Sequence, residues 1–137
     1  MNLRWKFLDA WHDAGLLILR VAAGGMIFGF HGFPMLSQGG KGWTRTGEVM
    51  SYLKIENNHL WWGFAAMCAM TLGAIALILG LAHRVACLLL FVTMAMATLS
   101  LYLPDRDITD AAYPLLMTVT CVSLFILGPG KYAVDKP

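Results

Sequence analysis

Residues 60–103 decide the fold, and they read LWWGFAAMCAMTLGAIALILGLAHRVACLLLFVTMAMATLSLYL. The stretch holds two long apolar runs, residues 60–81 and 85–103, and neither contains an acidic residue, a lysine or an arginine. Each is close to the ~20 residues that an α-helix needs to cross the hydrocarbon of a bilayer. The polar residues between them are His83 and Arg84. We therefore expect two membrane-spanning helices that a tight turn joins into an antiparallel hairpin.

Two further apolar runs flank this hairpin, at residues 15–36 and 111–128, and the last one leads into Gly128-Pro129-Gly130. Gly and Pro at that point stop a helix. None of the four runs shows the period-two alternation of a membrane strand. The sequence predicts an all-α fold with one integral membrane domain over residues 1–137. We expect an antiparallel, up-down four-helix bundle.

The composition indicates a lipid environment and excludes several other classes. Hydrophobic residues make up 58% of the chain and charged residues only 13%, about half the charged fraction of a usual soluble domain. A soluble chain of this length could not bury so much apolar surface. The net charge of +2 gives no support to a nucleic-acid partner. Three isolated cysteines without a C-x-x-C motif are interpreted as packing residues: Cys68, Cys87 and Cys121.

The segments between the runs predict the arrangement at the membrane surface. Residues 3–13 and 42–54 each place apolar side chains on one helical face and charged side chains elsewhere. Such segments lie on a membrane surface, so we expect two short interfacial amphipathic helices. Residues 104–110 are expected to form a short acidic loop. Four spans put both termini on one side, and a narrow excess of Lys and Arg there favours cytoplasmic termini.

The first run carries Arg20 and His31 inside a predicted span. They are eleven residues apart, which is three helical turns to within ~20°, so they share a face about 16 Å apart along the axis. Polar side chains in a span usually face a partner or a watery cavity. We expect both to face a polar cavity, where they are candidates for ligand binding or proton transfer. Two plainer interpretations stay open: Arg20 could snorkel to the headgroups, and His31 could bond a loop carbonyl.

Small residues recur at helical spacing in the first two spans. Gly25 and Gly29 form a small-x-x-x-small pair that Gly32 continues, and Gly73 belongs to a similar pair in the second run. Such spacing lets helix backbones approach closely in lipid. We expect these glycines to pack against another helix of this chain or of a partner.

Arg84 and Tyr113 are interpreted as anchors at the turn and at the start of the last run. The Tyr113 hydroxyl is expected at the membrane interface, where amphipathic rings prefer to lie. The sequence contains no Walker loop, dinucleotide fingerprint, paired-histidine metal spacing or acid pair within a span. It therefore predicts no catalytic residue and no metal site, and it leaves open whether the protein is an enzyme.

The same runs resemble the DoxX family of small bacterial and archaeal membrane proteins. Residues 16–36 read LLILRVAAGGMIFGFHGFPML, similar to the opening helix of that family with its Arg, its glycines and its His-Gly. Residues 73–90 read GAIALILGLAHRVACLLL, similar to its Gly-rich helix, tight turn with Arg and following helix. AAYPLL at 111–116 and LFILGPGKYAVD at 124–135 resemble its last helix and terminator.

The resemblance implies a four-helix protein of the bacterial or archaeal plasma (inner) membrane. It also implies a link to quinone-dependent sulfur oxidation, to quinol oxidase or redox-stress complexes, or to the assembly of other membrane proteins. Many members have a Glu in the second helix, whereas residues 69–71 here read Ala-Met-Thr. A proton route through that acid is therefore not implied, and Arg20, His31 and Arg84 are what remains to carry over.

Two functional hypotheses follow, and both keep the lipid bilayer as the environment. The first is a structural or assembly subunit without its own catalytic centre, packed against other membrane subunits or copies of itself. The alternative is a membrane subunit of a quinone-linked oxidoreductase, with a quinone headgroup bound near the first helix. No other cofactor is evident, and a small-solute carrier or channel is a third possibility.

Overall fold

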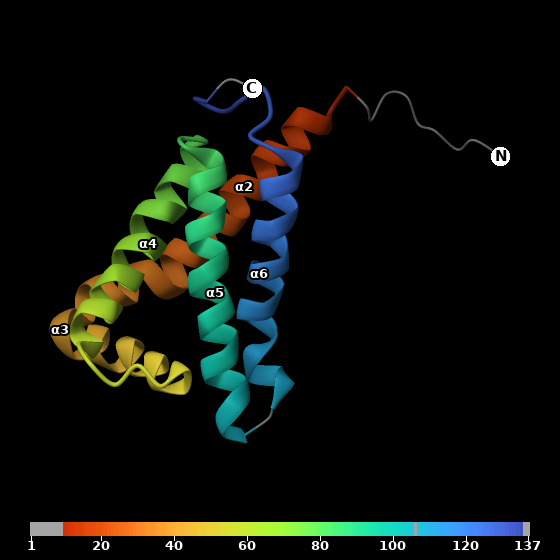
Figure 1. Ribbon diagram of the computed structural model, residues 1–137. Coiled ribbons are helices and arrows are strands. Elements are labelled where there is room, and N and C mark those ends of the chain that lie inside the picture. The colour runs from red at the N-terminus through yellow and green to blue at the C-terminus, as the bar shows by residue number, and fades with distance from the viewer. Residues whose placement is uncertain (1–9, 106, 136–137) are drawn as a thin grey trace.

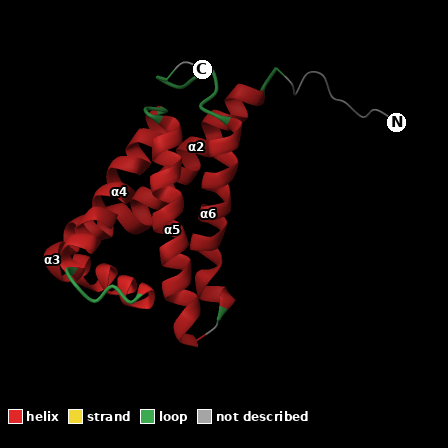
Figure 2. Cartoon of the chain, in the orientation of Figure 1, coloured by secondary structure: helices red, strands yellow, loops and turns green. Residues whose placement is uncertain are grey.

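The computed structural model describes residues 10–105 and 107–135, and within them it contains helices and turns but no strand (Figure 2). The first helical segment runs through α2 (His12–Ile27), a π-helix η1 (Phe28–Gly32), α3 (Phe33–Gly47) and a 3-10 helix η2 (Glu48–Leu53). Then follow α4 (His59–Leu79), α5 (His83–Asp105) and α6 (Ile108–Leu127). Four helical stretches are long and apolar enough to cross a membrane. The all-α, multi-pass membrane fold is thereby confirmed.

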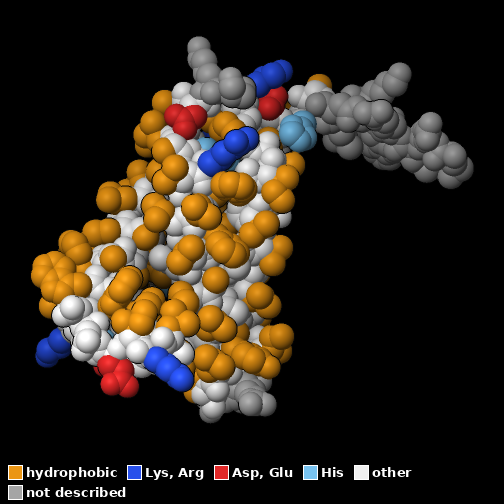
Figure 3. Space-filling view, in the orientation of Figure 1, with side chains coloured by type: hydrophobic (Ala, Val, Ile, Leu, Met, Phe, Trp, Pro, Cys, Tyr) orange, Lys and Arg blue, Asp and Glu red, His pale blue; other side chains and the backbone are white. Residues whose placement is uncertain are grey.

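The four spans lie side by side with their connections at alternate ends. In Figure 1 the chain descends through α2, rises through α4, descends through α5 and rises through α6. Both described ends of the chain therefore lie at the same end of the bundle. Figure 3 shows apolar side chains over the flank and charged side chains at its two ends, the distribution that a bilayer requires.

The connections differ from those that the sequence indicated. His83 and Arg84 belong to the first turn of α5, and the turn itself is made of residues 80–82, with φ of 72° at Gly80 and 41° at Ala82. Most of the expected 104–110 loop is helical, because Asp107 caps α6 by accepting a hydrogen bond of 2.8 Å from the Thr109 N–H. That bond also holds the pKa of the Asp107 carboxyl below its usual range.

A bend at Gly39 separates the first span from residues 40–53. Gly39 has φ of 62° and ψ of −149°, a conformation that is essentially limited to glycine. The indole N–H of Trp43 donates to the Met35 carbonyl at 2.9 Å and so ties the two sides of the bend together. Residues 42–53 are helical, as expected for one amphipathic segment. The other expected amphipathic segment, 3–13, lies outside the described residues as far as residue 9.

The interior of the bundle is filled by large apolar side chains from all four spans. The fully buried ones include Ile27, Leu77, Leu90, Met94 and Leu124. Cys87 and Cys121 are buried among them and Cys68 is half-buried, and all three are free thiols. This layer divides the polar residues of the interior into two groups, one at each end of the bundle.

Glycines set the close contacts between the first segment and α4, but they are not the ones that the sequence pattern favoured. A Cβ added at Gly24 would lie 2.9 Å from the Ala74 carbonyl and 2.6 Å from Ile78. By contrast, Gly25 and Gly29 face outward, with nothing within 4 Å of an added Cβ. The expected contact of these two with another helix of this chain is therefore wrong for the described residues. Two adjacent glycines point ~100° apart on a helix, and spacing alone does not tell which faces in.

Three other glycine contacts complete this picture. An added Cβ at Gly32 would lie 3.3 Å from the Thr71 hydroxyl of α4, and one at Gly73 would lie 3.3 Å from Leu90 of α5. Backbone meets backbone where α3 crosses α4, since a Cβ at Gly63 would overlap the Trp43 carbonyl. The α3–α4 crossing is thus fixed by the absence of a side chain.

Replacing Gly24 with Leu should lower the free energy of unfolding by about 1–3 kcal/mol, because the side chain must enter a well-packed contact. Gly25→Leu is the matched control on the next residue, and its added side chain points outward. Thermal unfolding in mild detergent measures both. Equal losses of stability in the two variants would contradict this account of the α2–α4 contact.

Candidate ligand-binding site

The π-helix η1 places His31 inside the bundle. Its wider turn is visible in the backbone, where the Phe33 N–H bonds to the Phe28 carbonyl five residues earlier. Short π segments inserted in α-helices are frequent at functional sites. Arg20 and His31 both face the interior of the bundle, but they have different neighbours: Arg20 reaches the C-terminal segment, and His31 lines a cavity.

Arg20 is fully buried, with 0% of its surface exposed. Its Nη1 donates to the Pro129 carbonyl and its Nη2 to the Tyr132 carbonyl at 3.4 Å. The guanidinium is held by the C-terminal segment, and Arg20 is not among the residues that line the ligand cavity described below. The C-terminal segment supplies the acceptors that a buried arginine needs.

The C-terminal segment, residues 128–135, lies across the end of the α4–α5 hairpin. The Val134 N–H donates to the Leu79 carbonyl at 3.2 Å and the Asp135 N–H to the Gly80 carbonyl at 3.0 Å. In return, the Asp135 carboxylate accepts a bond of 3.1 Å from the His83 N–H at the start of α5. Arg20 and this segment therefore close one end of the bundle together.

His83 was not singled out from the sequence beyond its place in the turn, yet it is almost completely buried. Its Nε2 lies 3.0 Å from the Leu124 carbonyl and ties the first turn of α5 to α6. Arg84, the next residue and the expected anchor at the turn, is exposed and borders a surface depression together with Asp135. A buried histidine in a turn carries no local sequence signal, because its partner is 41 residues away.

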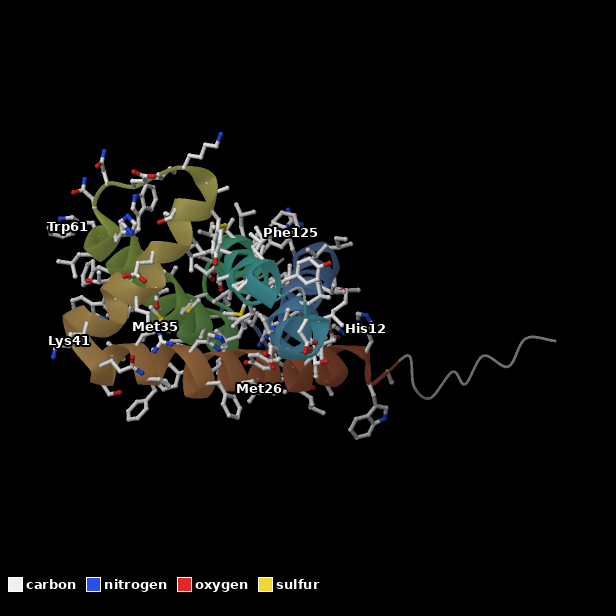
Figure 4. The ribbon with its side chains drawn as sticks, turned by 90° about the horizontal axis from the view of Figure 1, so that it is seen from below. His12, Met26, Met35, Lys41, Trp61 and Phe125 are labelled. Carbon is white, nitrogen blue, oxygen red and sulfur yellow. The ribbon has the colours of Figure 1, made fainter. Side chains whose placement is uncertain are left out.

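His31 lines a cavity of about 680 Å³ between η1, α3, η2, α4 and α5. Met35 lies on this wall and points between the helices in Figure 4, whereas Met26 points away from the bundle. The lining is mostly apolar and includes the Trp62 ring. Its polar side chains are His31, Gln38, Arg45, Thr46, Thr93 and Ser100. A large apolar pocket with a few convergent polar groups is what small-molecule sites look like.

A buried polar group lies beside His31 at the level of the π-helix. The Tyr113 ring of α6 stacks on the imidazole, with ring centroids 5.4 Å apart and planes 11° apart. The Tyr113 hydroxyl, the Thr71 hydroxyl and the His31 Nδ1 are buried and have no hydrogen-bond partner among the described residues. The expectation that the Tyr113 hydroxyl lies at the interface is therefore wrong. Buried polar atoms of this kind are normally paired with water or a ligand.

Gln38, Arg45 and Trp62 were missed as site residues. Gln38 and Arg45 belong to the part of the chain around Gly39, and the bend decides which side of it faces α4 and α5. The available signal was the Gly39-Gly40 pair at the end of an apolar run. Within residues 10–105 and 107–135, no group of three metal-ligating side chains occurs. The arrangement can donate hydrogen bonds into an apolar cavity and exchange a proton through His31.

Comparison with known proteins identifies one family. The sequence model described as DoxX matches residues 15–103, which cover the first three spans. No curated protein and no solved structure matches the chain. The matched range includes Arg20, His31 and the whole lining of the cavity, and it ends before Tyr113.

Replacing Arg20 with Leu should release the C-terminal segment, because hydrogen bonds to a charged group contribute about 1.5–3 kcal/mol each. Hydrogen exchange at the Val134 and Asp135 amides should become at least tenfold faster. In Arg20→Lys the exchange rates should lie between those of wild type and Arg20→Leu, since Lys keeps the charge but loses the planar fork. Arg84→Leu, an exposed arginine at the same end, is the control. Unchanged protection in Arg20→Leu would show that the segment is held without the guanidinium.

Proposed function

The chain belongs to the DoxX family, and from that premise we propose that this multi-pass membrane protein binds a quinone headgroup in the cavity beside His31. The observation that carries the proposal is the cavity of about 680 Å³ with His31 in its wall. Its location between helices that are long enough to span a bilayer suits a ligand that is dissolved in the membrane.

The polar groups of the cavity match the chemistry of a quinone ring. Quinone carbonyl oxygens accept hydrogen bonds, and His31, Gln38 and Arg45 all carry N–H donors. The remaining wall is apolar and includes the Trp62 ring, which is suited to a flat conjugated ring. His31 can also exchange a proton with the ring when the redox state changes.

The proposed role is that of a quinone-binding subunit, and the redox partner would be another protein. The acid that many DoxX members carry in the second helix is replaced here by residues 69–71, Ala-Met-Thr. His31, with the Tyr113 ring stacked on it, is then the proton-exchanging group. We place the protein in the plasma membrane with cytoplasmic termini, on the basis of the small excess of Lys and Arg at that end.

A second role, as a subunit that assembles with other membrane proteins, is favoured by a separate observation. Gly25 and Gly29 lie on the outward face of the first helix, where no part of the described chain approaches within 4 Å of an added Cβ. A face of small residues lets a partner helix come close. The two roles are compatible, because the cavity and this face use different residues.

His31→Leu should weaken quinone binding at least tenfold, about 1.4 kcal/mol or more, and leave the fold intact because Leu is tolerated in a span. Quenching of tryptophan fluorescence by a short-chain benzoquinone in lipid nanodiscs measures the affinity, with Trp62 on the cavity wall as reporter. His12→Leu removes an exposed imidazole at the far end of α2 and should have no effect. A Kd within twofold of wild type in His31→Leu would refute the site.

Gly29→Leu tests the assembly role. The monomer should unfold at an unchanged temperature, because no described residue lies within 4 Å of a Cβ added at Gly29, while the native complex should shrink or dissociate. Native gels of mild-detergent extracts show the assembly size. Gly15→Leu adds the same side chain to another open position of α2 and should leave the complex unchanged. A complex of wild-type size in Gly29→Leu would remove the case for this face.

A further inference from the structure

The cavity is several times larger than a quinone ring requires. A cavity of about 150 Å³ is sufficient to hold benzene, whereas this one measures about 680 Å³. The polar side chains of the wall could bind only a headgroup, so most of the volume is left for an apolar part of the same ligand.

One wall of the cavity belongs to the outer surface of the bundle. Leu88, Leu89 and Val92 of α5 line the cavity, yet Leu88 is 55% and Val92 52% exposed. Side chains that line a cavity and are also exposed mark its opening. Other lining residues are exposed as well, among them Phe30, Gln38, Arg45 and Trp62. The cavity therefore has a polar edge at Gln38 and Arg45 and an apolar opening past Leu88 and Val92 of α5.

The opening lies at hydrocarbon depth. The 23 residues of α5 extend over about 34 Å, and Val92 lies about 14 Å from the start of the helix. Both ends of α5 reach the charged ends of the bundle (Figure 3), so Val92 lies near the middle of the membrane. Val49 and Met50 of η2 border the same cavity and are apolar as well. A molecule that passes this opening moves between the cavity and the lipid, not between the cavity and water.

We infer that this opening is a lateral port that holds the isoprenoid tail of the quinone whose ring lies beside His31. The inference rests on the proposed function and extends it to the ligand class: a prenylated, membrane-resident quinone instead of a water-soluble one. The head is held by His31, Gln38 and Arg45, and the tail passes Leu88 and Val92 into the bilayer. One apolar tail accounts for the volume that the ring leaves, and it needs no polar partner.

Val92→Phe tests the port by filling it. Two probes are used in nanodiscs: a benzoquinone with a tail of three isoprene units, and the same ring with a methyl group in place of the tail. Each probe is compared with itself across variants, so its partition into lipid cancels. Val119→Phe is the control, since Val119 is 55% exposed on α6 and does not line the cavity. A double variant, Leu88→Phe with Val92→Phe, should strengthen the effect.

Val92→Phe should weaken the binding of the prenylated probe at least tenfold. Its affinity for the methyl probe should change by less than twofold. Val119→Phe should change neither. An unchanged affinity for the prenylated probe in both Val92→Phe and the double variant would overturn the port. An equal loss of affinity for both probes would overturn it as well, because the ring itself would then lie at Val92. The proposed function fails separately, if wild-type protein binds neither probe. A phospholipid in the cavity would give that last result.

Discussion

Hydrocarbon offers no hydrogen-bond partner, so each polar group inside a membrane protein has to find one within the chain or in a ligand. Arg20 obeys this constraint by binding carbonyls more than a hundred residues away, at Pro129 and Tyr132. The segment that supplies them then covers the α4–α5 turn, and Asp135 caps α5. At the other end of the interior, His31, Thr71 and Tyr113 keep polar atoms without a partner in the described chain. Arg20 Nε and His83 Nδ1 at the first end also lack a partner in the described chain, so what distinguishes the second end is the cavity that His31 lines.

The cavity exists because backbones meet closely on one side of it and diverge on the other. Gly47 and Gly63 allow α3 and α4 to touch through their main chains. The bend at Gly39 then directs residues 40–53 along the cavity instead of across the membrane. Larger residues at the crossing would separate α3 from α4, and an α-helical residue at position 39 would extend the first span. Two glycine contacts and one bend therefore determine both the shape and the polar lining of the site.

The location of His31 in a π-helix connects this architecture to chemistry. The π turn at Phe28–Gly32 surrounds His31, which lines the cavity, whereas Arg20 lies earlier, on α2, and bonds to the C-terminal segment. The stacked Tyr113 ring fixes the plane of the imidazole. A rigid, oriented histidine loses little freedom when it binds a ligand, which suits recognition of a planar headgroup.

Much of the fold was predictable from local pattern. Charge-free runs of about twenty residues have one stable structure in lipid, because only a helix satisfies its own backbone there, and the glycines at 39, 80 and 128 mark where the helices bend or end. His31 was likewise recognisable as a costly residue in a span.

What sequence did not reveal is how each helix is rotated and which distant residue it meets. Gly24 and Gly25 are equivalent in a spacing pattern, and their difference comes from the face that packs on α4. Arg20 to Pro129, His83 to Leu124 and His31 to Tyr113 join residues that are remote along the chain. The sequence alone determined the number and nature of the helices, because those depend on neighbours along the chain. The site was decided by tertiary structure, because it depends on packing between helices, which no local pattern records.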